Sequence, residues 1–390
     1  MATHSKYQFI TLGAQHTHID KIKDTFLSRV ADLGIDTASV AFIDRDNFPE
    51  YKGNSPTACL YFGEVPATAD LDELNILFAD AAFIIPVVDS LANFNDAIPT
   101  VIRGINGFEL NSETRIEALV GNVMEAMSLL RLSRRLFISY RRVESRSTAI
   151  QLYEHLDASG FDVFLDTHSI RPGEPFQEEL WHRLVDTDIV VLLHTPGFLG
   201  SEWTREELAK ASAMSIGILQ LVWPNHTIDD MSSLCFPKYL ETGDFVNGNY
   251  STGDISLNKD VIKAITNDVE SLRARSLAAR QDNIIKEFMS AATMHGFTAI
   301  LQPERFITVQ KKSGEEISVI PTVGVPHAFT YNQSEELVKK IRESKSSAAY
   351  IIFDHRNIRE KWQTHLAWLD VYLPVKAVKV TDLDKLFNSF

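Results

Sequence analysis

The chain has few cysteines and no excess of positive charge. Its 390 residues include only two cysteines, Cys59 and Cys235, and neither has a second cysteine or a histidine at ligand spacing. We therefore expect two reduced core thiols, with no disulfide and no metal site. Lysine and arginine number 38 against 52 aspartate and glutamate residues, which gives a net charge of −14. Because such a surface repels phosphate backbones and anionic lipid, we expect neither nucleic acid nor a membrane as a partner.

Long apolar runs and phosphate-binding glycine motifs are also missing. No run of about 18 apolar residues could span a bilayer, and the first residues lack the apolar segment of a secretion signal. The sequence therefore predicts a cytoplasmic protein. Gly13 and Gly107 lie in no G-x-G-x-x-G or Walker pattern. With 45% hydrophobic and 23% charged residues, the composition is typical of a globular chain of two or three domains.

Short β-rich apolar runs alternate with helical patterns, which is typical of an α/β protein with parallel sheets. The uninterrupted apolar run Ile189–Leu193 suits the buried centre of such a sheet. The patterns predict an N-terminal α/β domain, a connecting helix, a central domain, a long connecting helix and a C-terminal α/β domain. Their expected bounds are 1–110, 111–133, 134–250, 257–295 and 296–390.

The blocks share a pattern of an acidic helix followed by an apolar strand. When Asp72 is placed on Glu178, Phe83-Ile84-Ile85 falls on Ile189-Val190-Val191, and the third block has a similar order of elements. One interpretation is three related units. The other is that any α/β fold repeats this pattern, and the sequence leaves both open.

Four motifs follow one another in the central block, over about residues 134–224. They are Phe137-Ile138-Ser139-Tyr140-Arg141, Phe161 to Asp166, Ile170-Arg171-Pro172-Gly173, and Ser201-Glu202-Trp203-Thr204-Arg205-Glu206-Glu207-Leu208. In this order and spacing they resemble the TIR (Toll/interleukin-1 receptor) domain family, and within it the bacterial NAD-consuming proteins of the Thoeris-like antiviral type. The resemblance implies a flavodoxin-like parallel sheet in the middle third of the chain. Two further α/β units flank it, and they are degenerate TIR-like repeats if the first of the two interpretations above holds.

The resemblance also implies a reaction. Enzymatic TIR domains cleave the nicotinamide–ribose bond of NAD and yield ADP-ribose or a cyclic isomer, so NAD is the substrate and no cofactor is expected. The family's catalytic glutamate lies four residues after the tryptophan, which selects Glu207. Helix geometry agrees, because Trp203 and Glu207 share a face while Glu206 is turned about 100° away. A carboxylate there stabilises the oxocarbenium-like sugar that forms as nicotinamide leaves.

Ligands of open α/β sheets bind outside the carboxyl ends of the strands. We therefore expect the substrate-binding residues to be Ser139, Tyr140, Arg141, Asp166, Thr195 and Trp203. Arg141 suits the pyrophosphate, and Trp203 or Tyr140 suits an aromatic wall. The alternatives to these binding roles are that Trp203 packs in the hydrophobic core and that Arg141 is an exposed surface residue. His168 and His194 have no companions at metal-ligand spacing, so no metal is expected.

The loop from 166 to 175 is the expected contact for self-association. Pro172 and Gly173 give it a turn, and Ile170 is an apolar residue on a polar loop. The sequence thus predicts a homo-oligomeric NAD glycohydrolase or cyclase in antiphage defence, with a downstream effector that responds to its product. The alternative is a non-enzymatic TIR scaffold or a nucleotide-sensing protein that acts by self-association.

The outer blocks lack the catalytic acid in the alignment just described. Ala97 stands where the central block has Trp203, and Leu366 lies four residues after Trp362. We therefore expect the flanking blocks to be inactive and to act in regulation or ligand sensing.

Overall fold

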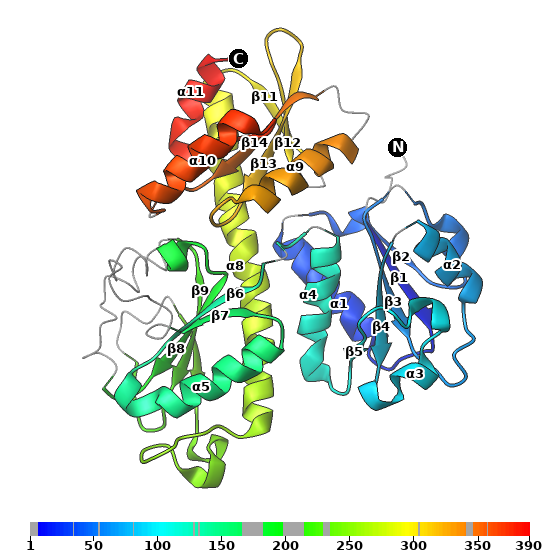
Figure 1. Ribbon diagram of the computed structural model, residues 1–390, viewed down its shortest axis with the longest axis vertical. Helices are drawn as coiled ribbons and strands as arrows, with labels where there is room; N and C mark the ends of the chain where they lie inside the picture. Colours follow the sequence, from blue (N-terminus) through cyan, green and yellow to red (C-terminus); the bar gives the residue numbers. More distant parts are fainter. Residues whose placement is uncertain are drawn as a thin grey trace. The chain divides into compact units, whose positions relative to one another are not determined.

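The computed structural model shows three sheets and a long helix (Figure 1). It divides into two compact units, Met1–Leu132 with Lys263–Ala274 (the first unit) and Ser133–Ile262 with Arg275–Phe390 (the second unit). Helix α8 (Lys259–Met294) contributes residues to both. The structure describes residues 7–33, 35–53, 55–80, 82–127, 129–131, 133–165, 182–197, 214–228, 235–302, 305–340, 346–356 and 358–390.

The first unit contains the N-terminal sheet, five parallel strands in the order β2-β1-β3-β4-β5. The strands are β1 (Tyr7–Gly13), β2 (Val40–Ile43), β3 (Thr57–Phe62), β4 (Phe83–Val88) and β5 (Phe108–Glu109). The helices are α1 (Ile19–Asp32), α2 (Leu71–Ala79), α3 (Phe94–Ala97) and α4 (Ile116–Ala126). On one face Phe9 packs on Phe26 of α1 at 5.0 Å, and on the other Ile10 shares a cluster with Leu74 of α2. Cover on both faces explains the continuous burial along β1 and β3.

Helix α4 ends earlier than the sequence predicts. The pattern favoured a helix to Leu132, whereas α4 ends at Ala126. The amides of Leu129 and Leu130 both donate to the carbonyl of Met124, which closes the helix with a turn. Both leucines are buried after that turn. Their apolar character therefore reflects burial and not helical periodicity.

The central sheet, in the second unit, has five parallel strands in the order β10-β9-β8-β6-β7. They are β6 (Arg135–Ser139), β7 (Asp162–Leu165), β8 (Ile189–His194), β9 (Gly217–Val222) and β10 (Phe236–Tyr239), and α5 (Arg142–Ala158) follows β6. Counted from its own first strand, this order equals that of the N-terminal sheet and is flavodoxin-like. The sequence missed β10, since Pro237 and the exposed Phe236 and Tyr239 belong to an edge strand without an apolar run.

The C-terminal sheet, also in the second unit, has a different design. Its strands are β11 (Thr298–Leu301), β12 (Ile307–Gln310), β13 (Glu316–Thr322), β14 (Ser346–Phe353) and β15 (Lys376–Lys379), with α9 (Ala328–Lys340), α10 (Glu360–Tyr372) and α11 (Leu383–Asn388). The strands lie in sequence order, antiparallel from β11 to β13 and parallel from β13 to β15. The hypothesis of three related units is therefore wrong for this block. Short connections such as the turn at Gly314 (φ +86°) impose antiparallel pairing.

The N-terminal and central sheets share a strand order, but not the alignment that the sequence pattern suggested. When Asp72 is placed on Glu178, β4 is aligned with β8. Along the chain, β4 is the fourth strand of its sheet, whereas β8 is the third strand of the central sheet. The order of the strands instead matches β3 with β8 and β4 with β9. The pattern of an acidic helix before an apolar strand occurs several times in each domain, so it did not fix which repeat matches which.

Within the second unit, Arg280 of α8 joins the C-terminal half to the central domain. Its guanidinium donates to the carbonyls of Val185 and Thr187, each at 2.6 Å, and the residue is 8% exposed. Nearby, the amide of Val325 donates to Asp186 at 3.0 Å. These contacts fix the segment that leads into β8.

We predict that Arg280→Ala lowers the free energy of unfolding of the second unit by about 1.5–3 kcal/mol, because buried carbonyls lose charged donors. Chemical denaturation followed by circular dichroism measures this. The matched control is Lys286→Ala on the same helix, whose exposed pair with Asp282 contributes at most about 0.5 kcal/mol. Equal stability of the two variants would contradict the assigned role of Arg280.

Both cysteines are free and buried. Burial raises the pKa of both thiols, that of Cys235 to about 11, so they stay protonated at neutral pH. None of the helices in the described part of the chain combines the length and hydropathy needed to cross a bilayer.

Candidate active site

Two of the predicted site residues are buried hydroxyls at the carboxyl edge of the central sheet. Ser139 ends β6 and is 0% exposed, while Thr195 follows β8 and is 1% exposed. Neither hydroxyl has a hydrogen-bond partner among the described residues. An unmade hydrogen bond at a buried hydroxyl costs about 1–3 kcal/mol, so these two hydroxyls are the polar groups at this edge that have hydrogen-bonding capacity to offer.

Tyr140 and Arg141 follow Ser139. Tyr140 is 5% exposed, so its ring belongs to the core and not to an aromatic wall. Arg141 precedes the first residue of α5, and its guanidinium forms an ion pair with Glu144. A phosphate contact by Arg141 therefore competes with that pair.

Glu144 connects the ends of two strands. One of its carboxylate oxygens pairs with Arg141, and the other accepts the amide of Gly197, after β8, at 3.1 Å. A Cβ at position 197 would collide with the guanidinium of Arg141, so a larger residue there would require the side chains of Arg141 and Glu144 to shift. Sequence reasoning missed Glu144 and Gly197, because their contact joins residues far apart in the chain.

A second group that the sequence missed surrounds His194 at the end of β8. The side-chain amide of Gln220 contacts Nδ1 of His194, and Nε2 of His226 lies 3.1 Å from Nε2 of His194. His194 and Gln220 are 2% and 0% exposed. A lone glutamine in the otherwise apolar strand β9 was the available signal, because a buried polar residue is more informative than an exposed one.

The remaining predicted residues lie outside the described residues. They are Asp166, Ile170, Pro172, Gly173, Trp203 and Glu207, together with the comparison residue Glu206 and with His168. Among the residues that the structure does describe, no three histidine, cysteine, aspartate or glutamate side chains are grouped so as to hold a metal ion.

Comparison with known proteins addresses the central domain. A family model of the TIR domain matches residues 136–247, a segment that contains all four sequence motifs. Residues 136–247 form a TIR domain. A protein of Brachypodium distachyon named probable 2' cyclic ADP-D-ribose synthase BdTIR is 32% identical over 74 residues. That similarity covers 19% of this chain and 33% of the relative, so the chain spans about a third of the length of the curated relative that it matches.

Proposed function

We propose that the TIR domain of this chain cleaves the nicotinamide–ribose bond of NAD, as an NAD nucleosidase with Glu207 as the catalytic carboxylate. The main support is the TIR match over residues 136–247, within which an acid lies four residues after Trp203. The name of the similar Brachypodium protein, a cyclic ADP-ribose synthase, supports the same reaction class.

The proposed chemistry needs one well-placed carboxylate. The bond between ribose C1′ and the ring nitrogen breaks, and nicotinamide leaves with the electron pair as a neutral molecule. Glu207 stabilises the resulting oxocarbenium-like sugar. Water then attacks C1′ and releases a proton to give ADP-ribose, or a nucleophile of the same molecule attacks to give a cyclic isomer. The hydroxyls of Ser139 and Thr195 bind the substrate at the strand ends, and Arg141 binds the pyrophosphate after exchanging its contact with Glu144.

Chromatography of the products after incubation of the purified chain with NAD tests this proposal. Nicotinamide together with ADP-ribose indicates a hydrolase, and nicotinamide with a compound of the mass of ADP-ribose minus water indicates a cyclase. If NAD is recovered intact from oligomeric protein, the chain is instead a TIR scaffold that acts by association.

We further propose that the protein acts as a homo-oligomer in bacterial antiphage defence in the cytoplasm, and that an effector protein responds to its product. Ile170→Asp is predicted to lower NAD cleavage and the assembled fraction together, because a charge in an apolar contact between subunits remains desolvated. Light scattering alongside the activity assay measures both. Arg171→Ala, at the neighbouring position, is the control for a change in the loop itself. Loss of activity in particles of unchanged size would contradict the role in assembly.

A further inference from the structure

The N-terminal sheet has a cavity of about 820 Å³ at the carboxyl edge of β1, β2 and β3. Strand β2 lies on one side of β1 and β3 on the other, so the cavity lies where the strand order reverses. Open α/β sheets bind ligands at this position, and the volume is that of a small-molecule site. Its lining includes Gly13, Arg45, Phe62, Glu64, Ala69 and Glu73.

A carboxylate of the chain already occupies the place where a phosphate would bind. The amide of Gly13, at the end of β1, donates to Oδ2 of Asp70 at 2.7 Å, and the other oxygen of Asp70 pairs with Arg45. The Asp70 side chain is 3% exposed. Gly13 has a φ of +84°, and a Cβ there would collide with the carbonyl of Phe62, so the turn keeps this geometry. Because the amide and the cation are both engaged by Asp70, the cavity disfavours a phosphate.

The charges around the cavity favour a ligand that donates hydrogen bonds. Glu64 and Glu73 are partly exposed and line the cavity. Arg45 has its pKa raised, chiefly by its hydrogen bond to Asp70 and to a smaller extent by the charges of Glu64 and Glu73. Carboxylates accept from sugar hydroxyls, as the acidic residue of a dinucleotide fold does from ribose. A neutral or cationic polyhydroxyl therefore fits better than an anion.

The shared strand order gives Glu73 a counterpart in the TIR domain. When Phe83, where β4 begins, is placed on Gly217, where β9 begins, Glu73 falls on Glu207. In this alignment the N-terminal block has an acid at that position, whereas the alignment that places Asp72 on Glu178 gives it none. In the new alignment Ala69 replaces Trp203, so the N-terminal edge has the acid without that aromatic ring.

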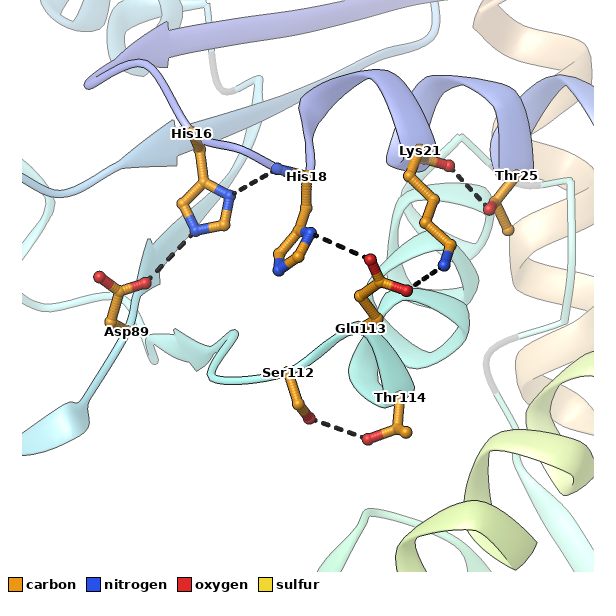
Figure 2. Close-up of polar contacts among 8 residues, drawn as sticks. All are labelled: His16, His18, Lys21, Thr25, Asp89, Ser112, Glu113 and Thr114. Atoms are coloured by element: carbon orange, nitrogen blue, oxygen red, sulfur yellow. Dashed lines mark hydrogen bonds and ion pairs between the residues drawn. The ribbon is translucent and has the colours of Figure 1, made fainter.

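Polar contacts hold the loop that follows β1 (Figure 2). Phe62 lines the cavity and stacks on His16 at 5.0 Å, and Nε2 of His16 lies 3.3 Å from Asp89 after β4. The amide of His18 donates to Nδ1 of His16, and Glu113 contacts both His18 and Lys21. His16 thus contacts Asp89 after β4, and His18 contacts Glu113 before α4. These contacts hold the loop at the wall of the cavity in place.

We propose that this cavity binds a phosphate-free ribonucleoside, whose ribose hydroxyls donate to Glu73 and Glu64. This site lies in the N-terminal block and is distinct from the site proposed for NAD cleavage in the TIR domain.

Calorimetric titration of the full chain with adenosine and with nicotinamide riboside, compared with AMP and ADP-ribose, tests the proposal. At least one nucleoside is expected to bind with a Kd below about 1 mM and at least about tenfold more tightly than AMP. Glu73→Gln is expected to weaken that binding about tenfold or more, because charge-assisted hydrogen bonds are lost. Glu50→Gln, the same change at an exposed site outside the cavity, is expected to have no effect.

Two further variants complete the test. Ala69→Trp fills the cavity and is expected to abolish binding, with circular dichroism confirming that the sheet is intact. Glu207→Gln is expected to retain nucleoside binding, whatever happens to NAD cleavage. The proposal is wrong if neither nucleoside binds, if AMP binds as tightly, or if Glu207→Gln abolishes binding while Glu73→Gln does not.

Discussion

Glu207→Gln is expected to lower the rate of NAD cleavage by on the order of 10²–10³, equivalent to about 3–4 kcal/mol of transition-state stabilisation. Glutamine keeps the size and hydrogen-bonding capacity of glutamate but removes its charge, so the variant tests electrostatic stabilisation of the sugar cation. Nicotinamide release under single-turnover conditions measures the effect. Affinity for NAD is expected to change little, because the charge matters most when the bond breaks.

Glu206→Gln is the matched control, since the sequence places the same residue type one position earlier and on another face of the expected helix. It is expected to retain near wild-type turnover. Both variants are expected to fold normally, because a glutamate near a helix start contributes only about 0.3–1 kcal/mol through the helix dipole. Wild-type turnover by Glu207→Gln, with an unchanged melting temperature, would refute the assignment of the carboxylate.

Arg273→Ala is expected to destabilise the first unit by about 3–5 kcal/mol. Arg273 is 1% exposed, and its guanidinium donates to Glu125 at 2.6 Å and to the carbonyl of Arg131 at 2.8 Å. The alanine variant leaves the Glu125 carboxylate buried without this partner, which costs more than the lost contact itself. Hydrogen exchange at the amides of β1 and β3 measures the stability of the first unit within the full chain.

The double variant Glu125→Leu with Arg273→Met separates lost charge pairing from lost packing. Replacing a buried ion pair by apolar side chains of similar size is often close to neutral, so the double variant is expected to recover most of the stability. If the double variant is as unstable as Arg273→Ala, the apolar contacts of the arginine stem dominate, and the ion pair is not the main source of stability.

The carboxyl edges of the N-terminal and central sheets share a strand order but differ in their polar groups. At the central edge, the buried hydroxyls of Ser139 and Thr195 have no hydrogen-bond partner among the described residues. At the N-terminal edge, the Asp70 carboxylate accepts a hydrogen bond from the amide of Gly13. One strand order thus presents different polar groups at its two edges, because the fold fixes where the edge lies and the loops decide which groups it carries.

The sequence predicted the buried strands well because their apolar runs are continuous. The expected strand Ile189–Leu193 lies within β8, and Phe83–Val88 coincides with β4. It missed β10 because an edge strand with Pro237 and exposed aromatic side chains has no such run. It extended α4 through Leu129 and Leu130 because a buried turn and a buried helix face have the same composition.

The sequence by itself determined the TIR motifs and the position of Glu207, because these depend on short spacings along one chain segment. Only the tertiary structure showed that the amide of Gly13 donates to Asp70. It also showed that Glu144 pairs with Arg141 and accepts from the amide of Gly197 in the loop after β8. It also decided which strands correspond, because the strand order matches β3 with β8 and β4 with β9. The physical reason is that hydrophobic periodicity specifies which residues are buried, whereas strand order and packing specify which distant residues meet.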